Sequence, residues 1–448
     1  MSILNTLDQP FLADAGSSEV RPGRGLDWLD ACRANGMARF QKSGMPTPKL
    51  EDWKYTRLKS LEDTKFRSVV AADANFTVNA VPSIVPDAEE QPYRFVFVDG
   101  QPRLDLFQID DMPGDVIIGS MDSVLEKHGD VVREHFAANP EFGAMADLNM
   151  AMMDSGFVMI VPAGTILDRP VEVVYIGGGV DDPVAYFPRN LIVLGDNAEA
   201  TLLKYHMGEG VGAYFANAVT DIKLGQNAKL RHVKVQGENR NATHTARTQV
   251  RVERDATYDG FLLAIGGRLS RNELHVQLVG EGASCSVNGA YLMRGSEHCD
   301  ITTRIDHLAP HTTCNEMFRG VLDDQARGVF QGKIVVHKGA QKIEGHQACN
   351  TLLLSDGAEI DAKPELEIYA DDVKCSHGAT TGQIDETALF YLRSRGIPEA
   401  LARNLLIQSF LGGVLEKISD ESLREALMHR IVHWLPAQCF LSDEWRDG

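Results

Sequence analysis

The sequence of 448 residues contains no apolar run close to the roughly 18–20 residues that a transmembrane helix needs. Its first residues, MSILNTLDQPFLADAG, lack the basic start and the sustained apolar stretch of a secretory signal peptide, so we expect none. Positive charge is scarce, since 44 Lys and Arg stand against 63 Asp and Glu, a formal net charge of −19. Nucleic acids and anionic membranes are bound by clustered Lys and Arg, so we expect neither as a main partner.

Cysteine is also sparse, with seven residues scattered along the chain and no Cys-x-x-Cys pair. Such a set does not indicate a disulfide framework, and it predicts a cytoplasmic protein in a reducing compartment. The nucleotide-binding motif G-x-x-x-x-G-K-[ST] is absent, and so are H-E-x-x-H, G-x-S-x-G and a G-x-G-x-x-G between a strand and a helix. The chain is therefore not itself a P-loop ATPase.

The length predicts two or three domains, or one elongated repeat domain with additional segments. Residues 1–155 have a mixed helical and β pattern. Helical spacing is present over Gly25–Gly44, Met121–Phe136 and Phe142–Gly156. The stretch YRFVFVDGQPRLD predicts a hairpin that turns at Asp99-Gly100. We therefore expect an N-terminal α/β region before the main body of the chain.

Residues 156–383 consist of short β-like runs and turns, with no long amphipathic helix between them. Each of several polar turns is followed by an alanine and then a strand, at Ala198, Ala228, Ala256 and Ala283, with sequence intervals of 30, 28 and 27 between them. A repeat of this length, with half-repeats near 14, predicts a mainly β solenoid whose turns each supply two opposite strands. We expect turns of about 27–32 residues, and about eight of them between 156 and 383. A large β-sandwich is the alternative.

Residues 384–448 form a helical tail. Pro398 stands where a helix is expected to start, and leucines from Leu401 to Leu415 follow with helical spacing. Ser419-Asp420-Glu421 opens the last helix. These helices predict either a cap on the end of the solenoid or a docking platform for another protein.

The cysteines of the later repeats are the candidates for chemistry. The sequence interval between Cys285 and Cys314 is 29, and that between Cys349 and Cys375 is 26, so each pair is predicted to stack on neighbouring turns. For Cys285, Cys299 and Cys314, burial as small apolar groups is the favoured interpretation.

DDVKCSHGAT places Cys375 and His377 two residues apart, and therefore on one face of a strand. A metal site, a nucleophile–base pair and ordinary packing all remain open. Thiolate and imidazole suit zinc or an iron–sulfur cluster, but Cys349, Cys375 and His377 are too few to close a four-ligand site. Either the site is open or a second chain completes it.

The stretches KPELEIYADDVKCSHGATTGQIDETALFYLRSRGIPEALA, NTLLLSDGAEIDAKP and PTPKLEDWKYTRL closely resemble the SufD family, scaffold subunits of the SUF system for iron–sulfur cluster assembly. The resemblance implies a right-handed parallel β-helix between an N-terminal α/β region and a C-terminal helical region. It also implies a complex with the paralogue SufB, through the end of the β-helix, and with the ABC-type ATPase SufC, through the C-terminal helices. The isolated chain is expected to be able to form a homodimer.

The same resemblance implies that a nascent, transient iron–sulfur cluster forms at the SufB–SufD interface, where a histidine of C-S-H-G-A-T faces a SufB cysteine. That histidine maps onto His377, and the accompanying cysteine maps onto Cys375. Cys349, in GHQACNTLLLS, stands where SufB has its sulfur-accepting cysteine. Cys349 therefore either carries SufB-like sulfur chemistry or is incidental, and flavin binding is left undecided.

Two rival functions remain. A carbohydrate-active β-helix enzyme would need carboxylates that converge in a groove, and Asp306, Asp323 and Glu344 are the candidates for such a cluster. A purely structural interaction protein would have no metal role. The predicted function is a non-catalytic scaffold for cluster assembly.

Overall fold

The structure is a computed structural model that describes residues 8–13, 21–69, 81–85, 91–136, 143–179 and 182–436. Two predictions of the sequence analysis fall largely outside these ranges: the start of the chain, where we expect no signal peptide, and the end of the tail, 437–448. No helix in the described part of the chain is both long and apolar enough to span a membrane.

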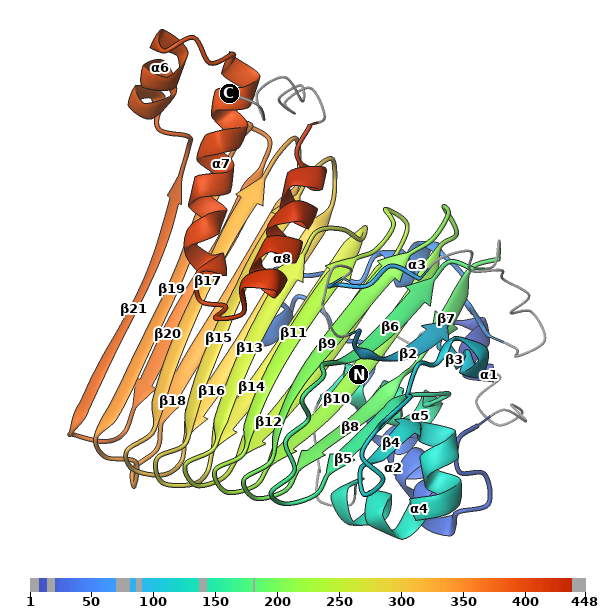
Figure 1. Cartoon of the computed structure of the whole chain (residues 1–448). Helices are drawn as coiled ribbons and strands as arrows, with labels where there is room; N and C mark the ends of the chain where they lie inside the picture. Colours follow the sequence, from blue (N-terminus) through green and yellow to red (C-terminus); the bar gives the residue numbers. More distant parts are fainter. Residues whose placement is uncertain are drawn as a thin grey trace.

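Two sheets face each other and take their strands alternately along the chain (Figure 1). The main path of the eleven-stranded sheet consists of β4 Ile117–Ser120, β5 Phe157–Val161, β8 Arg189–Leu194, β10 Tyr214–Leu224, β12 Thr243–Val252, β14 Leu269–Leu278, β16 His298–His307, β18 Arg327–Val336 and β20 Glu359–Ile368, with the short β1 Arg67–Ser68 and β7 Val184–Tyr186 beside it. The ten-stranded sheet consists of β3 Gln101–Pro102, β2 Tyr93–Val98, β6 Val171–Gly177, β9 Glu199–Gly208, β11 Lys229–Gly237, β13 Thr257–Ala264, β15 Ser284–Met293, β17 Thr313–Leu322, β19 Ile343–Leu353 and β21 Val373–Gly382.

The strands from β8 to β21 pair in parallel with the strand one turn earlier, which defines a parallel β-solenoid of about seven turns. In the ten-stranded sheet, Glu199 pairs with Lys229 and Lys229 pairs with Thr257, so the sequence offsets of these pairs are 30 and 28. The offsets range from 26, between β12 and β14, to 32, between β18 and β20. The predicted solenoid is confirmed. Its shortest turn has 26 residues, one fewer than the expected minimum of 27, and it has about seven turns where about eight were expected.

The turn alanines mark where one strand ends and the next begins. Asn197, Asn227 and Asp255 precede three of these alanines and have φ of 59°, 57° and 56°, a left-handed conformation that Asn and Asp tolerate better than other L-residues. The alanines that follow, Ala198, Ala228 and Ala256, are completely buried. The repeat seen in the sequence therefore records a positive-φ turn followed by a small inward side chain.

The first turns are covered by the N-terminal region, whose helices are α1 Pro10–Ala13, α2 Asp27–Ser43, α3 Ser60–Asp63, α4 Met121–Phe136 and α5 Ala144–Met152. The helices predicted around Gly25–Gly44, Met121–Phe136 and Phe142–Gly156 are confirmed as α2, α4 and α5, residue 142 being outside the described ranges. The hairpin is also confirmed, since β2 pairs antiparallel with β3 and Asp99-Gly100 turn with φ of 44° and 83°.

The tail, as far as residue 436, contains three helices, α6 Glu386–Ser394, α7 Glu399–Leu415 and α8 Glu421–Trp434. Asp420 caps α8, as predicted, by accepting a hydrogen bond from the backbone N–H of Leu423. Helices α7 and α8 lie on the outer face of the ten-stranded sheet, where Leu411 and Leu427 belong to one apolar cluster with sheet residues such as Val321 (Figure 1). The tail therefore covers a face of the solenoid and does not close its end.

Candidate functional site

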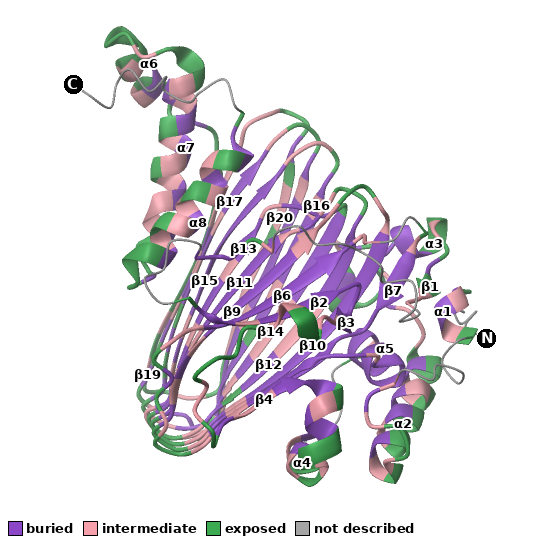
Figure 2. Ribbon diagram, turned by 45° about the vertical axis from the view of Figure 1, so that its right-hand side comes forward, coloured by how far each residue is buried: buried purple, intermediate pink, exposed green. Residues whose placement is uncertain are grey.

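The last turn of the solenoid ends in two bare strands, β20 in one sheet and β21 in the other. In β21 only Val373 and Cys375 are partly buried, and the other eight residues are exposed. Strands of the middle turns are buried along most of their length, whereas exposed residues concentrate in the helices and turns (Figure 2). The exposed β21 thus differs from the strands stacked before it, although it continues the same repeat.

Because the strands pair in register, inward-facing residues of successive turns form columns that end at β21. One column runs through Cys285, Cys314, Gly345 and Cys375. Cys285 and Cys314 therefore stack on neighbouring turns, as predicted, and both are buried, as is Cys299 on the opposite sheet. Cys375 ends this column and packs against the interior apolar cluster.

Gly345 leaves space in the column for side chains from both neighbouring turns. A Cβ atom placed on Gly345 would stand 3.3 Å from Cys314 Sγ and 3.5 Å from Cys375 Sγ. It would also stand 3.8 Å from Nε2 of His307, whose Nε2 is 3.2 Å from Cys314 Sγ. Two thiols and an imidazole therefore converge beneath the last turn.

The thiols of this cluster are protonated at rest. Burial raises the pKa of Cys314 and also that of Cys375. Burial lowers the pKa of His307 to about 4, so its imidazole is neutral at cell pH. Either thiol therefore has to give its proton to a base or to water, with metal binding favouring the loss, before it can act as a ligand or nucleophile.

His377 occupies the neighbouring column. It is exposed and lies two residues after Cys375 in β21, which puts both side chains on the same face of the strand. In register behind it stand Gln347 and then Glu316. Gln347 Nε2 donates a hydrogen bond of 2.6 Å to Glu316 Oε2, and burial raises the pKa of Glu316 to about 7. An ionisable carboxyl group is therefore connected to the residue directly behind His377.

Cys349 does not join Cys375 and His377. It pairs in register with Ala379, whereas Cys375 pairs with Gly345, so the stacking of Cys349 on Cys375 expected from their spacing of 26 is wrong. Four residues along a strand separate the two levels by about 13 Å. Cys349 is buried, and burial raises the pKa of its thiol to about 12. Its Sγ lies 3.9 Å from the Tyr291 hydroxyl oxygen.

The carboxylates that a carbohydrate-active enzyme would use do not gather in one groove. Glu344 pairs with Thr313 at the start of β17, whereas Asp323 follows the end of that strand. Ten residues of extended chain separate Thr313 from Asp323, a distance of about 33 Å. Asp306 is buried and accepts hydrogen bonds from Arg304, with Nε at 2.7 Å from Oδ2. The separation of Glu344 from Asp323 removes the support for this rival.

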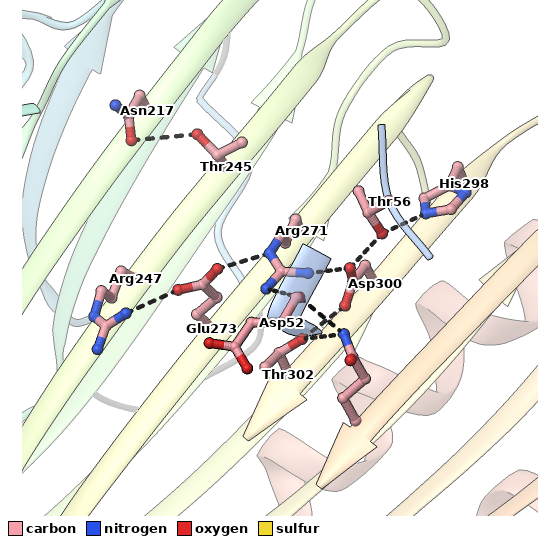
Figure 3. Close-up of polar contacts among 11 residues, drawn as sticks. Asp52, Thr56, Asn217, Thr245, Arg247, Arg271, Glu273, His298, Asp300 and Thr302 are labelled. Carbon is pink, nitrogen blue, oxygen red and sulfur yellow. Dashed lines mark hydrogen bonds and ion pairs between the residues drawn. The ribbon is translucent and has the colours of Figure 1, made fainter. Parts of the chain in front are cut away.

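The conspicuous N-terminal stretch PTPKLEDWKYTRL is bound to the outer face of the eleven-stranded sheet (Figure 3). Arg271, on β14, donates from Nη2 to the carbonyl oxygen of Asp52 at 2.8 Å, and its guanidinium lies 3.9 Å above the Trp53 ring. The same guanidinium forms ion pairs with Asp300 and with Glu273. Arg271 therefore fastens the N-terminal region to the middle of the solenoid.

Thr56 adds a second attachment in the same place. Its hydroxyl donates to Asp300 and lies 3.0 Å from Nε2 of His298 (Figure 3). The stretch 46–58 is therefore a structural clamp, and it lies on the outside of the solenoid, away from the interior column of Cys375.

His307 and Glu316 are the residues of this candidate site that sequence reasoning missed, and Cys314 was predicted only as a buried, stacked residue. The signal was present in the spacing: from strand to strand, the sequence intervals along Cys285, Cys314, Gly345 and Cys375 are 29, 31 and 30. Glu316 and His377 each stand two residues after a cysteine of this column. An alignment of successive solenoid turns would have placed Cys314 and Cys375 in one column.

Comparison with known proteins places the chain in a family. Residues 175–410 match the family model described as "SUF system FeS cluster assembly, SufBD core domain", and residues 22–173 match the "SufBD protein N-terminal region". The iron–sulfur cluster assembly protein SufD of Escherichia coli is 31% identical over 405 residues, which cover 89% of this chain and 92% of that protein.

Other relatives agree. A SufBD family protein of Synechocystis is 30% identical over 393 residues, 86% of each chain, and SufD of Bacillus subtilis is 24% identical over 444 residues, 94% of this chain and 97% of that protein. A parallel β-solenoid of the SufBD type is the class that the fold and the match define. The chain belongs to the SufBD family and has a role in iron–sulfur cluster assembly.

Proposed function

We propose that this chain is a non-catalytic scaffold subunit that binds a SufB-like subunit through its last turn. The observation that carries the proposal is the end of the solenoid, where β20 and β21 present unpaired edges together with Cys375 and His377. Exposed edge strands readily pair with another chain, and natural proteins usually cover them. A second β-solenoid of the same family would continue both sheets across this end.

Cys375 and His377 would face the nascent cluster at that interface. Thiolate and neutral imidazole are ligands for iron in iron–sulfur sites. Two such ligands are too few to hold a cluster alone, so the partner subunit and inorganic sulfide would supply the others. The cluster is the cargo of the assembly and leaves it, whereas the ligands stay. Cys314 and His307 behind Cys375 would form a second thiol–imidazole pair within the chain.

The ATPase would bind at the C-terminal helices, the proposed docking region 384–448. Helix α6 exposes two adjacent aromatic residues, Phe390 at 72% and Tyr391 at 57%. Exposed aromatic side chains of this kind are enriched at the centres of protein interfaces. ATP hydrolysis would belong to that partner. Point variants of α6 test this docking better than a deletion of all residues after Asp385, because α7 and α8 cover an apolar face of the sheet that the deletion would expose.

The cysteines of the chain bear on its cellular compartment. The six cysteines in the described residues are free thiols, which supports a reducing compartment such as the cytoplasm. In the absence of the SufB-like partner, the bare strands of two copies would pair with each other to give a homodimer.

The decisive test of the site compares two histidines of the last turns. His377→Ala should abolish cluster assembly in cells that depend on the SUF system, while the complex still forms. His346→Ala is the matched control, because His346 lies on β19 in the preceding turn, is partly exposed and bonds Ser376, which alternates to the other face of β21 from His377. Protein levels, complex formation and cluster content are measured for both. Normal growth and cluster content in His377→Ala would refute the site and leave a purely structural interaction protein.

The cysteines are tested separately. Cys375→Ser should lower cluster content, because its thiol ends the column beside His377. Cys349→Ser should have little effect, because its thiol is buried about 13 Å along the strands from that level. A strong loss of assembly in Cys349→Ser with a folded complex would instead support SufB-like sulfur chemistry at Cys349.

A further inference from the structure

A second group of metal-binding side chains lies between the sheets, far from the last turn. His206, on β9, is 1% exposed, and neither of its ring nitrogens has a hydrogen-bond partner among the described residues. Its ring stacks on Tyr175, with centroids 4.8 Å apart and planes 12° apart, so packing fixes its orientation. A buried imidazole with two unpaired nitrogens bears the desolvation cost of both atoms without a compensating bond.

Two further ligand side chains stand beside His206. His244, on β12 of the opposite sheet, has its ring centroid 4.8 Å away at 73° to the His206 ring. Glu238 follows β11, and its Oε2 lies 3.1 Å from His244 Nδ1. One ligand atom from each of the three residues lies within 4.8 Å of the others, and all three residues are buried. Tetrahedral zinc needs its ligand atoms about 3.3 Å apart, so the set has to contract by up to about 1.5 Å when it binds an ion.

The residues around this triad hold its ligands in place. Lys234 Nζ lies 2.8 Å from His244 Nε2 and donates at 2.6 Å to Asn272 Oδ1, so the second nitrogen of His244 already has a partner. Gln236 Nε2 donates at 2.9 Å to Glu238 Oε2. Metal sites characteristically have outer contacts of the Gln236–Glu238 kind, in which a hydrogen bond orients a ligating carboxylate. No comparable contact engages His206 among the described residues, so its nitrogens are the atoms left for an ion.

We propose that His206, Glu238 and His244 bind a first-row divalent transition metal ion, Zn²⁺ or Fe²⁺, inside the early turns of the solenoid. Two imidazoles and one carboxylate are a ligand set for both ions and leave at least one coordination position open. The three ligands come from both sheets, so the ion would tie the sheets together at this level. This site shares no residue with the last turn and does not depend on the function proposed there.

His206→Phe tests the site, because phenylalanine keeps the stack on Tyr175 and removes both nitrogens. The full chain, without a polyhistidine tag and carrying Cys375→Ser and His377→Ala to silence the last turn, is loaded with Co²⁺ or Zn²⁺ and freed of excess ion. The parent protein should retain one more equivalent of metal than the His206→Phe protein. EDTA should lower the melting temperature of the parent protein and leave that of His206→Phe unchanged.

His232→Phe is the matched control, since His232 is a buried histidine of the neighbouring strand that contacts the Tyr258 hydroxyl at 3.0 Å and lies outside the triad. It should retain the ion. Equal metal content in the parent and His206→Phe, or a higher melting temperature in His206→Phe with no EDTA effect on the parent, would overturn the site.

A spectrum of the parent protein decides the question even if a variant fails to fold. Bound Co²⁺ should give visible bands of nitrogen and oxygen ligation without the intense charge-transfer absorption of thiolates. No bound Co²⁺, or a thiolate spectrum alone, would refute the proposal.

Discussion

The two ends of the solenoid are built from the same repeat and finish in opposite ways. At the N-terminal end, the antiparallel strands β3 and β4 close the sheets and helices cover the first turns. At the C-terminal end, no strand of the described residues pairs with the outer edges of the parallel strands β20 and β21. Solenoids usually have both ends covered, so the bare end is the surface that we propose a partner covers.

The buried carboxylates near the clamp and near the last turn also have different partners. Near the clamp, Arg271 is 1% exposed and neutralises both Asp300 and Glu273. Near the last turn, the buried Glu316 receives a bond from the neutral amide of Gln347 and no cation is bonded to it among the described residues. The first arrangement stabilises the isolated chain, whereas the second keeps an ionisable group close to the proposed interface.

The largest effect is expected at the clamp. Arg271→Ala should lower the free energy of unfolding by about 3–5 kcal/mol, because it leaves the buried carboxylate of Asp300 without its cation, although Glu273 keeps its ion pair with Arg247. Lys363→Ala is the control, since Lys363 pairs with Glu51 of the same clamp segment at the surface and should cost no more than about 1 kcal/mol. Urea denaturation of both proteins measures the difference. Equal losses would show that the clamp does not depend on the buried network.

Glu316→Gln should stabilise the chain in alkaline solution and not in acid. The pKa of Glu316 is raised by burial from its ordinary value of 4.5 to about 7, so folding loses stability as the pH rises from about 4.5 to 7. At about 1.4 kcal/mol for each pH unit, the penalty above pH 7 is about 3 kcal/mol, and the amide removes it. Urea denaturation at pH 5 and pH 8 should show a gain of about 2–3 kcal/mol only at pH 8. A gain of equal size at both pH values would contradict this assignment.

Charge on the bare end should weaken partner binding. Ile368, the last residue of β20, is 41% exposed, and Ile368→Asp should lower the affinity for a SufB-like subunit at least about tenfold, because a charge would be buried in the interface. Ile166→Asp is the matched control at the other end of the solenoid, where Ile166 is 63% exposed. Titration calorimetry compares the two. Equal weakening would mean that the bare end is not the binding surface.

The smallest effect on the solenoid itself is expected at α6. Phe390→Ser should reduce binding of a SufC-like ATPase about tenfold and leave both the melting temperature and the binding of the SufB-like subunit unchanged, because the Phe390 ring contributes little to the folded core. Leu405→Ser, which alters a 39% exposed residue of α7, is the control for loss of apolar surface. Undiminished ATPase binding by Phe390→Ser would place the docking surface elsewhere.

The period of the solenoid was predictable because each turn requires a residue of positive φ followed by a small buried one, and Asn197-Ala198 and its repeats carry that signal. The pairing of individual residues was not. The loops between strands differ in length, so the sequence offset between paired strands varies from 26 to 32. The spacing of 26 between Cys349 and Cys375 falls in that range although their strands pair with an offset of 30.

The other misses have a similar origin. Whether α7 and α8 cap the end or cover a face depends on the apolar surface that the ten-stranded sheet offers, which the sequence of the helices does not record. The triad of His206, Glu238 and His244 comes from two sheets and a loop, and no local spacing links its members. Sequence therefore predicts the repeating part of this molecule better than the contacts between its separate parts.

Hydrogen–deuterium exchange of β21 shows whether a partner covers the end of the solenoid. In the isolated chain at low concentration, the amides of Val373–Gly382 that are not bonded to β19 should exchange rapidly, because one edge of the strand is bare. Addition of the SufB-like subunit should slow exchange in this strand and in β20, and leave α6 unchanged. Rapid exchange of β21 in the complex, with protection appearing at the N-terminal helices instead, would contradict the account.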